Sequence, residues 1–200
     1  MNPRIVLALS LTCATLFAAV LLAAAQTRGA PSTAGFSGAL RPPGMPPADF
    51  VLRDQDGRRV TAGQVRGRVT VVTFLYTTCV DTCPLIAQQV RGALDRLDTD
   101  VPVLALSVAP GQDTPERARQ FLARQRLTGR ARFLLGPEDE LQGQWRAYGI
   151  QPQTFGEEED HSAHVVVLDR RGVQRVGFPA DKLTPEGLAA DIERLQAERS

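Results

Sequence analysis

Residues 69–84 read VTVVTFLYTTCVDTCP, a run of β-branched and aromatic residues that ends in two cysteines and a proline. The run 69–76 has the composition of a strand that is buried on both faces. Pro84 suits the first turn of a helix, where its missing N–H costs no hydrogen bond. The sequence therefore predicts a strand-to-helix junction, with Cys79 and Cys83 beside the N-terminus of the helix.

The two cysteines of this junction have the setting of reactive thiols. Unpaired amides and the positive end of the helix dipole favour anions, so we expect the pKa of each thiol to fall. Cys79 and Cys83 can then close a short disulfide when oxidised, or chelate a soft metal such as Cu(I) or zinc when reduced. The remaining cysteine, Cys13, lies far away in an apolar stretch. One pair cannot complete a structural zinc site, which needs four ligands and usually takes them from two Cys or Cys/His pairs. A purely stabilising disulfide is the alternative, although so short a loop restricts the unfolded chain little.

The overall composition fits one globular domain with an appendage. The chain has 200 residues, of which 43% are hydrophobic and 22% are charged, and its formal net charge is +1. A near-neutral chain without a basic cluster lacks the electrostatic footprint of nucleic-acid binding. We therefore expect no nucleic-acid partner.

The N-terminal residues 1–25 have the features of a membrane segment. Residues 5–25 follow Arg4 without a charged side chain, and they are long enough to cross a hydrocarbon core of about 30 Å as a helix. We predict a transmembrane anchor over residues 1–25, with a cleaved secretory signal as the alternative because residues 23–25 are all alanine. Arg4 on the short N-terminal side favours an extracytoplasmic location for the domain, periplasmic or outer. Cys13 is then an apolar membrane residue.

The next residues, 26–47, are rich in glycine, alanine, serine and proline and have no apolar period, which predicts a linker. The domain is placed at residues 48–200. It should open with a hairpin, because an Asp-Gly pair separates the strand-like residues 50–52 and 59–61.

The rest of the domain alternates between strand-like and helix-like patterns. Helices are predicted at 85–97, 115–127 with a stop at Gly129, 138–148 and 183–195, and further strands at 101–108, 132–135, 165–168 and 174–178. A strand, a helix and a strand of this length form a right-handed parallel crossover, whereas the last two strands should pair antiparallel across a short turn. Trp145 is interpreted as a core residue. The prediction is an α/β protein of thioredoxin-like fold, with a central mixed sheet flanked by helices and the cysteines at the carboxyl end of a strand, where ligands gather.

Both histidines of the chain follow an acidic loop. Residues 157–160 are all carboxylates, and His161 and His164 come immediately before the strand 165–168. The acidic run is most simply a solvated loop, but it would favour the protonated form of His161 and could concentrate cations. His164 should lie within the strand as a packed or edge residue.

Four stretches of the domain together form a recognisable set. They are C-x-x-x-C-P at 79–84 after an aromatic strand end, Ser-Val at 107–108 followed by Asp-Thr-Pro at 113–115, Leu-Thr-Gly at 127–129, and Asp-His-Ser at 160–162. With them, residues 45–197 resemble the Sco/SenC family of copper-binding proteins of respiratory oxidase assembly. One departure is visible, since Ala109 precedes Pro110 where the family often has Asp-Pro.

The resemblance implies copper, as Cu(I) or Cu(II), held by Cys79, Cys83 and His161. Asp81, between the cysteines, is expected either to stabilise the turn or to tune the thiolates. The implied function is a metallochaperone, a carrier rather than an enzyme, that delivers copper to the dinuclear copper site of a cytochrome oxidase. The implied partners are the copper-site subunit of the oxidase, the membrane, and another copper chaperone or a thioredoxin-like reductant.

Two other activities use the same thiols. An extracytoplasmic thiol–disulfide oxidoreductase would reduce the copper-ligand cysteines of the oxidase by cycling Cys79 and Cys83 through a disulfide. Such an enzyme does not require His161, and its cysteines usually have the tighter Cys-x-x-Cys spacing. A peroxidase would need one peroxidatic cysteine in a pocket lined by proline and threonine, and no proline precedes Thr77 and Thr78 in the strand end.

Overall fold

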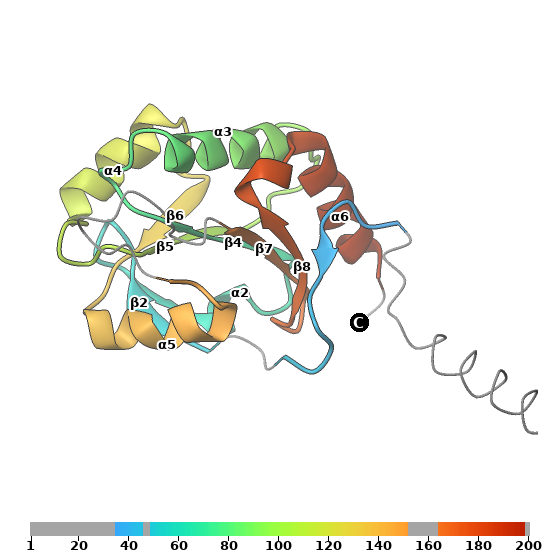
Figure 1. Cartoon of the computed structure of the whole chain (residues 1–200), viewed down its shortest axis with the longest axis horizontal. Helices are drawn as coiled ribbons and strands as arrows, with labels where there is room; N and C mark the ends of the chain where they lie inside the picture. Colours follow the sequence, from blue (N-terminus) through green and yellow to red (C-terminus); the bar gives the residue numbers. More distant parts are fainter. Residues whose placement is uncertain (1–34, 46–48, 152–163, 199–200) are drawn as a thin grey trace, which may run out of the picture. The chain divides into compact units, whose positions relative to one another are not determined.

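A computed structural model describes residues 35–45, 49–151 and 164–198 of the chain (Figure 1), and the described residues belong to one compact unit, Gly35–Ser200. In chain order its elements are β1 (Ala39–Leu40), β2 (Val51–Arg53), β3 (Arg59–Thr61), α2 (Ala62–Val65), β4 (Thr70–Leu75), α3 (Thr82–Leu94), β5 (Val103–Ser107), α4 (Pro115–Arg124), β6 (Ala131–Leu134), α5 (Glu138–Tyr148), β7 (His164–Leu168), β8 (Gln174–Pro179), the 3₁₀ turn η2 (Ala180–Lys182) and α6 (Pro185–Ala197).

The centre of the unit is a mixed sheet with the strand order β1-β8-β7-β4-β5-β6. Strand β4 pairs parallel with β5 on one side and antiparallel with β7 on the other, and β7 pairs antiparallel with β8. Strands β2 and β3 form a separate hairpin. The predicted parallel pairing of β4 and β5, the antiparallel C-terminal pair and the hairpin are confirmed, but the hairpin does not open the domain because β1 precedes it.

Helices cover both faces of this sheet. Helices α3, α4 and α6 lie on one face, and α5 and α2 lie on the other together with the hairpin (Figure 1). Successive side chains of a strand point to opposite faces, so Val71 and Leu75 of β4 pack under α3 whereas Val72 and Phe74 pack against α5. All six residues of β4 are buried, which confirms the expectation for its β-branched sequence.

The second half of the predicted linker 26–47 belongs to the folded unit. Strand β1 lies within residues 26–47 and pairs with β8, so the folded unit begins before residue 48. The carboxylate of Asp191 on α6, which is fully buried, accepts hydrogen bonds from the backbone N–H of Ser37 at 2.8 Å and of Gly38 at 2.9 Å. Gly38 also lies against β8 so closely that a Cβ atom would stand 2.5 Å from the side chain of Val176. This segment is held by partners about 150 residues away in sequence, which its composition does not reveal.

Helix α4 ends earlier than predicted, at Arg124 instead of near Gly129. Arg126 adopts a left-handed conformation with φ of 56°. Its N–H donates to the carbonyl of Ala123, and the N–H of Leu127 donates to that of Leu122, which is the hydrogen-bond pattern of a Schellman motif. The apolar residues that extend the helical period to 127 therefore belong to the cap, where Leu127 is buried.

The predicted transmembrane anchor, residues 1–25, lies outside the described residues. Across the ranges 35–45, 49–151 and 164–198, the structure has no helix that is both long and apolar enough to cross a membrane.

Candidate metal centre

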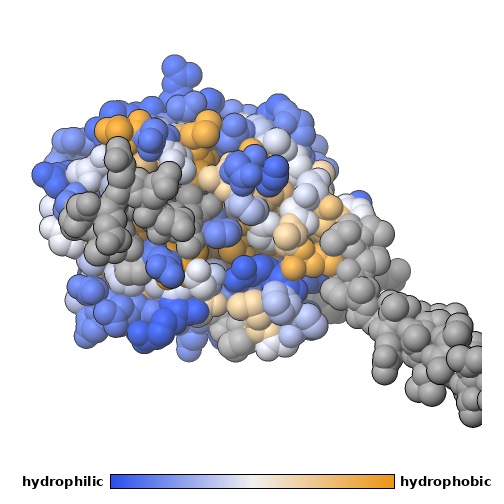
Figure 2. All heavy atoms as spheres, viewed as in Figure 1, coloured by the Kyte–Doolittle hydropathy of each residue, from blue (hydrophilic) through white to orange (hydrophobic). Residues whose placement is uncertain are grey.

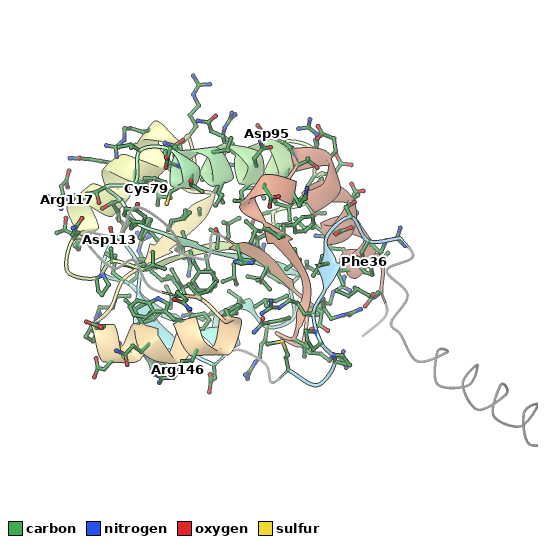
Figure 3. All side chains as sticks on the ribbon, in the orientation of Figure 1. Phe36, Cys79, Asp95, Asp113, Arg117 and Arg146 are labelled. Carbon is green, nitrogen blue, oxygen red and sulfur yellow. The ribbon has the colours of Figure 1, made fainter. Side chains whose placement is uncertain are left out.

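The two cysteines lie where β4 ends and α3 begins. The backbone N–H of Cys79 donates to the carbonyl of Tyr76 at 3.3 Å, which turns the chain directly after the strand. Cys83 is the second residue of α3, and Pro84 follows it in the first turn, as predicted. Cys79 lies between α3 and the sheet, at the end of the sheet where Asp113 also lies (Figure 3).

Cys79 and Cys83 are both free and both buried. The backbone N–H of Cys83 donates to the sulfur of Cys79 at 3.1 Å. The pKa of Cys79 is lowered to about 6, chiefly because the Cys83 thiol also donates a hydrogen bond to the Cys79 sulfur, and burial opposes this effect only in part. Cys79 is therefore the thiolate of the pair near neutral pH.

The pKa of Cys83, in contrast, is raised. The main cause is that its thiol donates to Cys79, and burial adds to the effect because Cys83 is fully buried. The expectation that the pKa of both thiols would fall is thus wrong for Cys83. Two thiols that share a hydrogen bond at one helix N-terminus cannot both lose their protons easily, and the more buried one keeps its proton.

This asymmetry predicts which thiol reacts first. Because the pKa of Cys79 is lowered to about 6, the rate at which iodoacetamide alkylates the reduced, metal-free protein should rise with pH and level off above pH 7. The rate at pH 5 should be about one tenth of that at pH 7, since the thiolate fraction changes by this factor. Peptide mass mapping should find the label on Cys79 before Cys83. Alkylation that rises only above pH 8, or that begins at Cys83, would contradict this assignment.

Asp81 begins α3 and also lies beside the thiolate. Its carboxylate accepts a hydrogen bond from the backbone N–H of Thr82 at 2.5 Å and lies 3.8 Å from the sulfur of Cys79. Its carbonyl accepts from Leu85 in the first turn of the helix. Asp81 therefore both caps the helix and contacts Cys79, so the two roles considered for it are combined.

A buried carboxylate supports the loop before the cysteines. One oxygen of Asp113 accepts from the backbone N–H of Thr77 at 2.7 Å and from its hydroxyl at 2.6 Å, and the other accepts from the hydroxyl of Ser107 at 2.5 Å. Burial raises the pKa of Asp113, while these hydrogen bonds act in the opposite direction. In the sequence, Asp113 stood out only as part of the Asp-Thr-Pro stretch of the family resemblance. A better signal would have been that Thr77 and Ser107 are polar residues at two neighbouring strand ends.

Asp113→Asn should test this support. An amide has one acceptor oxygen where the carboxylate has two, so the free energy of unfolding should fall by about 1–3 kcal/mol. Urea unfolding measures this change. Asp181→Asn is the matched control, since the Asp181 side chain is 71% exposed, and a loss as large in the control would refute the role of Asp113.

The two histidines are placed differently. His164 is the first residue of β7, where its carbonyl accepts from the hydroxyl of Thr73 at 3.2 Å, so its expected position in the strand is confirmed. His164 lies on the same face of the strand as Val166 and Leu168, which pack on the α5 side of the sheet. Cys79 and Cys83 pack on the α3 side. The buried Nδ1 of His164 has no hydrogen-bond partner within the described ranges. His161 lies outside the described residues.

The surface around the cysteines includes exposed apolar side chains. Val80 is 89% exposed and Leu85 is 50% exposed, although most of the face shown in Figure 2 is hydrophilic, with apolar residues in a few patches. Together with Val51 on the hairpin, they are the exposed large hydrophobic residues of the described part of the chain.

The donor set at this junction fits a soft metal. One thiolate and one thiol lie four residues apart and share a hydrogen bond, and thiolates select copper(I), zinc or iron–sulfur clusters. Among the described residues, no group of three or more cysteine, histidine or carboxylate side chains is arranged to hold a metal ion.

The sequence model of the SCO1/SenC family matches residues 42–197, which is most of the chain and all of the sheet except β1. The chain belongs to the SCO1/SenC family. It is 29% identical over 77 residues to the SCO1 protein homolog of Bacillus subtilis, an alignment that covers 37% of this chain and 40% of the relative.

Solved structures with the same fold agree with this membership. Bradyrhizobium japonicum ScoI with copper bound is 29% identical, with a TM-score of 0.62 over 74% of this chain and 98% of that one. BsSco, described as having a disulfide switch and as a member of the Sco family of cytochrome c oxidase assembly proteins, is 21% identical, with a TM-score of 0.69 over 80% of this chain and 99% of that one. The central mixed sheet flanked by helices thus matches the thioredoxin-like structures of Sco proteins.

Proposed function

We propose that this protein is a copper carrier that binds one copper ion through Cys79, Cys83 and His161 and delivers it to a respiratory cytochrome oxidase, at its dinuclear copper site. The observation that carries the proposal is the pair of free thiols at the end of β4, of which Cys79 has its pKa lowered to about 6. Such a pair supplies a thiolate ligand at neutral pH, and a second one once copper displaces the proton of Cys83.

The third ligand is proposed from the path of the chain. Thr73 of β4 pairs with Val165 of β7, so β7 begins beside the carboxyl end of β4, which leads to the cysteines. Three residues span at most roughly 10 Å, which keeps His161 within reach of this end of the sheet. His164 alternates onto the opposite face, so His161 is the better candidate of the two. Three ligands leave one position open to an incoming ligand of the receiving protein, which suits a carrier.

Copper stoichiometry tests this function directly. The reduced chain should retain one copper per molecule after dialysis against a weak chelator. In the Cu(II) form it should show thiolate-to-copper charge-transfer bands, which His161→Ala should change. Copper that dialyses away completely from the reduced chain would refute the proposal.

A second candidate is a thiol–disulfide reductase, favoured by the asymmetry of the two thiols. The thiolate of Cys79 would attack a disulfide of the partner, form a mixed disulfide and release one partner thiolate, which takes up a proton. Cys83 would then give up its proton and attack Cys79, so that the partner gains two electrons and leaves as a dithiol while Cys79 and Cys83 become a disulfide. The substrate would be the oxidised pair of copper-ligand cysteines of the oxidase.

The two candidates separate on His161→Ala. A reductase variant should reduce a peptide disulfide as fast as the original chain, whereas a carrier variant should lose copper affinity. Unchanged copper affinity in His161→Ala together with rapid disulfide reduction would favour the reductase.

The cellular setting follows from the same proposals. Residues 1–25 would anchor the chain in the membrane and hold the domain on the extracytoplasmic side, where the oxidase subunit that receives copper would meet it. A second copper chaperone would load the site, or a thioredoxin-like reductant would return the cysteines to their reduced form.

A further inference from the structure

A second concave site lies at the end of the sheet away from the cysteines. The cysteines follow the carboxyl end of β4, whereas this cleft is lined by the first residues of β5 and β6, its parallel neighbours. The cleft has a volume of about 730 Å³ and is bounded by the β2–β3 turn, α4 and the residues around the end of α2. Its volume is that of a small-molecule pocket.

The lining of this cleft is rich in arginine. Its charged residues are Arg58, Arg68, Arg119, Arg130 and Arg132, together with Asp54, Asp56 and Asp100. Two of the arginines also pair with carboxylates outside the lining, so the positive charge that is available to a ligand depends on the arginines that are least engaged. One oxygen of Asp54 is already engaged by the backbone N–H groups of residues 56 and 58, each at 2.9 Å.

The arginines differ in how fully they are engaged. Arg68 pairs with Asp100 at 2.9 Å, and Arg130 pairs with Asp95 outside the cleft. Arg119 is held by the carbonyl of Gln55 at 2.7 Å and by Glu116 at 2.9 Å, so its guanidinium is fixed in place.

Two arginines keep donors for a ligand. Arg132, exposed on the edge strand β6, makes no ion pair or hydrogen bond through its side chain within the described residues. The side chain of Arg58 is 76% exposed. Its single acidic partner among those residues is Asp56, at a long distance of 3.5 Å, so this ion pair holds the guanidinium weakly.

We propose that this cleft binds a phosphate-bearing anion. Guanidinium groups match the geometry of phosphate oxygens and donate two hydrogen bonds at once, and several of them around one concavity favour a ligand with more than one negative charge. A free phosphate compound and the head group of an anionic phospholipid share this chemistry. The site is separate from the copper site, so its occupation does not depend on the cysteines.

Titration of the full-length chain with inorganic pyrophosphate tests the proposal. At constant ionic strength, calorimetry should give saturable binding with a stoichiometry near one, and chloride at the same ionic strength should give none. Arg132→Gln and Arg58→Gln should each weaken binding by about threefold to fivefold, the effect expected of one exposed charge pair. The matched control is Arg146→Gln, because Arg146 lies on α5 outside the cleft and bonds only to Gln142 among the described residues (Figure 3).

The source of the phosphate is settled by a second arm with vesicles. Flotation with phosphatidylcholine vesicles measures the contribution of the N-terminal segment. Additional flotation with phosphatidylglycerol vesicles that Arg132→Gln reduces, without saturable pyrophosphate binding, would identify a lipid head group as the ligand. Pyrophosphate binding without such flotation would identify a free phosphate compound. Equal weakening by Arg132→Gln and Arg146→Gln in both arms, or no binding in either arm, would overturn the proposal. Neither cleft variant removes a buried contact, so loss of folding does not confuse the result.

Discussion

Cys79→Ser and Cys83→Ser should each abolish stoichiometric copper binding. A serine hydroxyl does not ionise near neutral pH and is a hard ligand, so each change removes one of two soft donors. Loss of a residue that only hydrogen-bonds to a metal ligand lowers metal affinity by up to about a hundredfold. Loss of a ligand itself should lower copper affinity by more than this. Competition with a chromogenic Cu(I) chelator measures it. Cys83→Ala should also raise the pKa of Cys79, because it removes the hydrogen-bond donor that is the main cause of the lowering.

The histidines provide the matched pair for this experiment. His161→Ala should weaken copper binding by at least about tenfold, whereas His164→Ala should leave it unchanged, since His164 alternates onto the α5 face of the sheet. Both variants remove one imidazole from the same short segment, so the comparison isolates the ligand role from any general effect on the loop. A damaging His164→Ala beside a harmless His161→Ala would show that the histidine assignment is wrong.

The sequence predicted the fold wherever the local pattern and the tertiary structure agree. The run 69–76 is apolar throughout because β4 is covered on both faces, and the Thr114-Pro115 and Thr184-Pro185 pairs begin helices α4 and α6 with the threonine side chain as cap. Strand β1 was not predicted because the segment before it is held by Asp191, and an acidic residue is rarely expected to be fully buried even where the helical period places it on the buried face. Composition alone cannot reveal that a carboxylate will be buried against two backbone amides.

The sequence predicted the position of the two cysteines at the start of α3 but not their electrostatics, and the ligand role of His161 stays a prediction. Spacing and the helix N-terminus placed Cys79 and Cys83 together. They did not show that Cys83 is fully buried and that its thiol donates a hydrogen bond to Cys79. This hydrogen bond lowers the pKa of Cys79 and raises the pKa of Cys83. Asp113 was missed as a support for the same reason, because its three hydrogen bonds join segments that meet only in the folded sheet.

Trp145→Ala should have the largest effect on stability. Trp145 is 2% exposed within the core between the sheet and α5, and its indole N–H donates to the carbonyl of Ser107 at 2.9 Å, so its interpretation as a core residue is confirmed. Removing the ring leaves a large cavity, and the free energy of unfolding should fall by about 3–5 kcal/mol. This is a large part of the roughly 5–15 kcal/mol that holds a typical domain folded. Urea unfolding followed by circular dichroism measures the change. Tryptophan fluorescence cannot follow the variant, because Trp145 is the single tryptophan of the chain.

Trp145→Phe separates the cavity from the hydrogen bond. Phenylalanine keeps most of the buried volume but has no N–H, so the loss should be only about 1–2 kcal/mol. Ser107, whose carbonyl Trp145 contacts, donates its hydroxyl to Asp113, and Asp113 in turn holds Thr77 next to the cysteines. If Trp145 positions the site through this chain of contacts, Trp145→Phe should shift the pH at which Cys79 reacts, and an unchanged profile would restrict its role to the core. A cost below about 1 kcal/mol for Trp145→Ala would contradict the packing of α5 on this sheet.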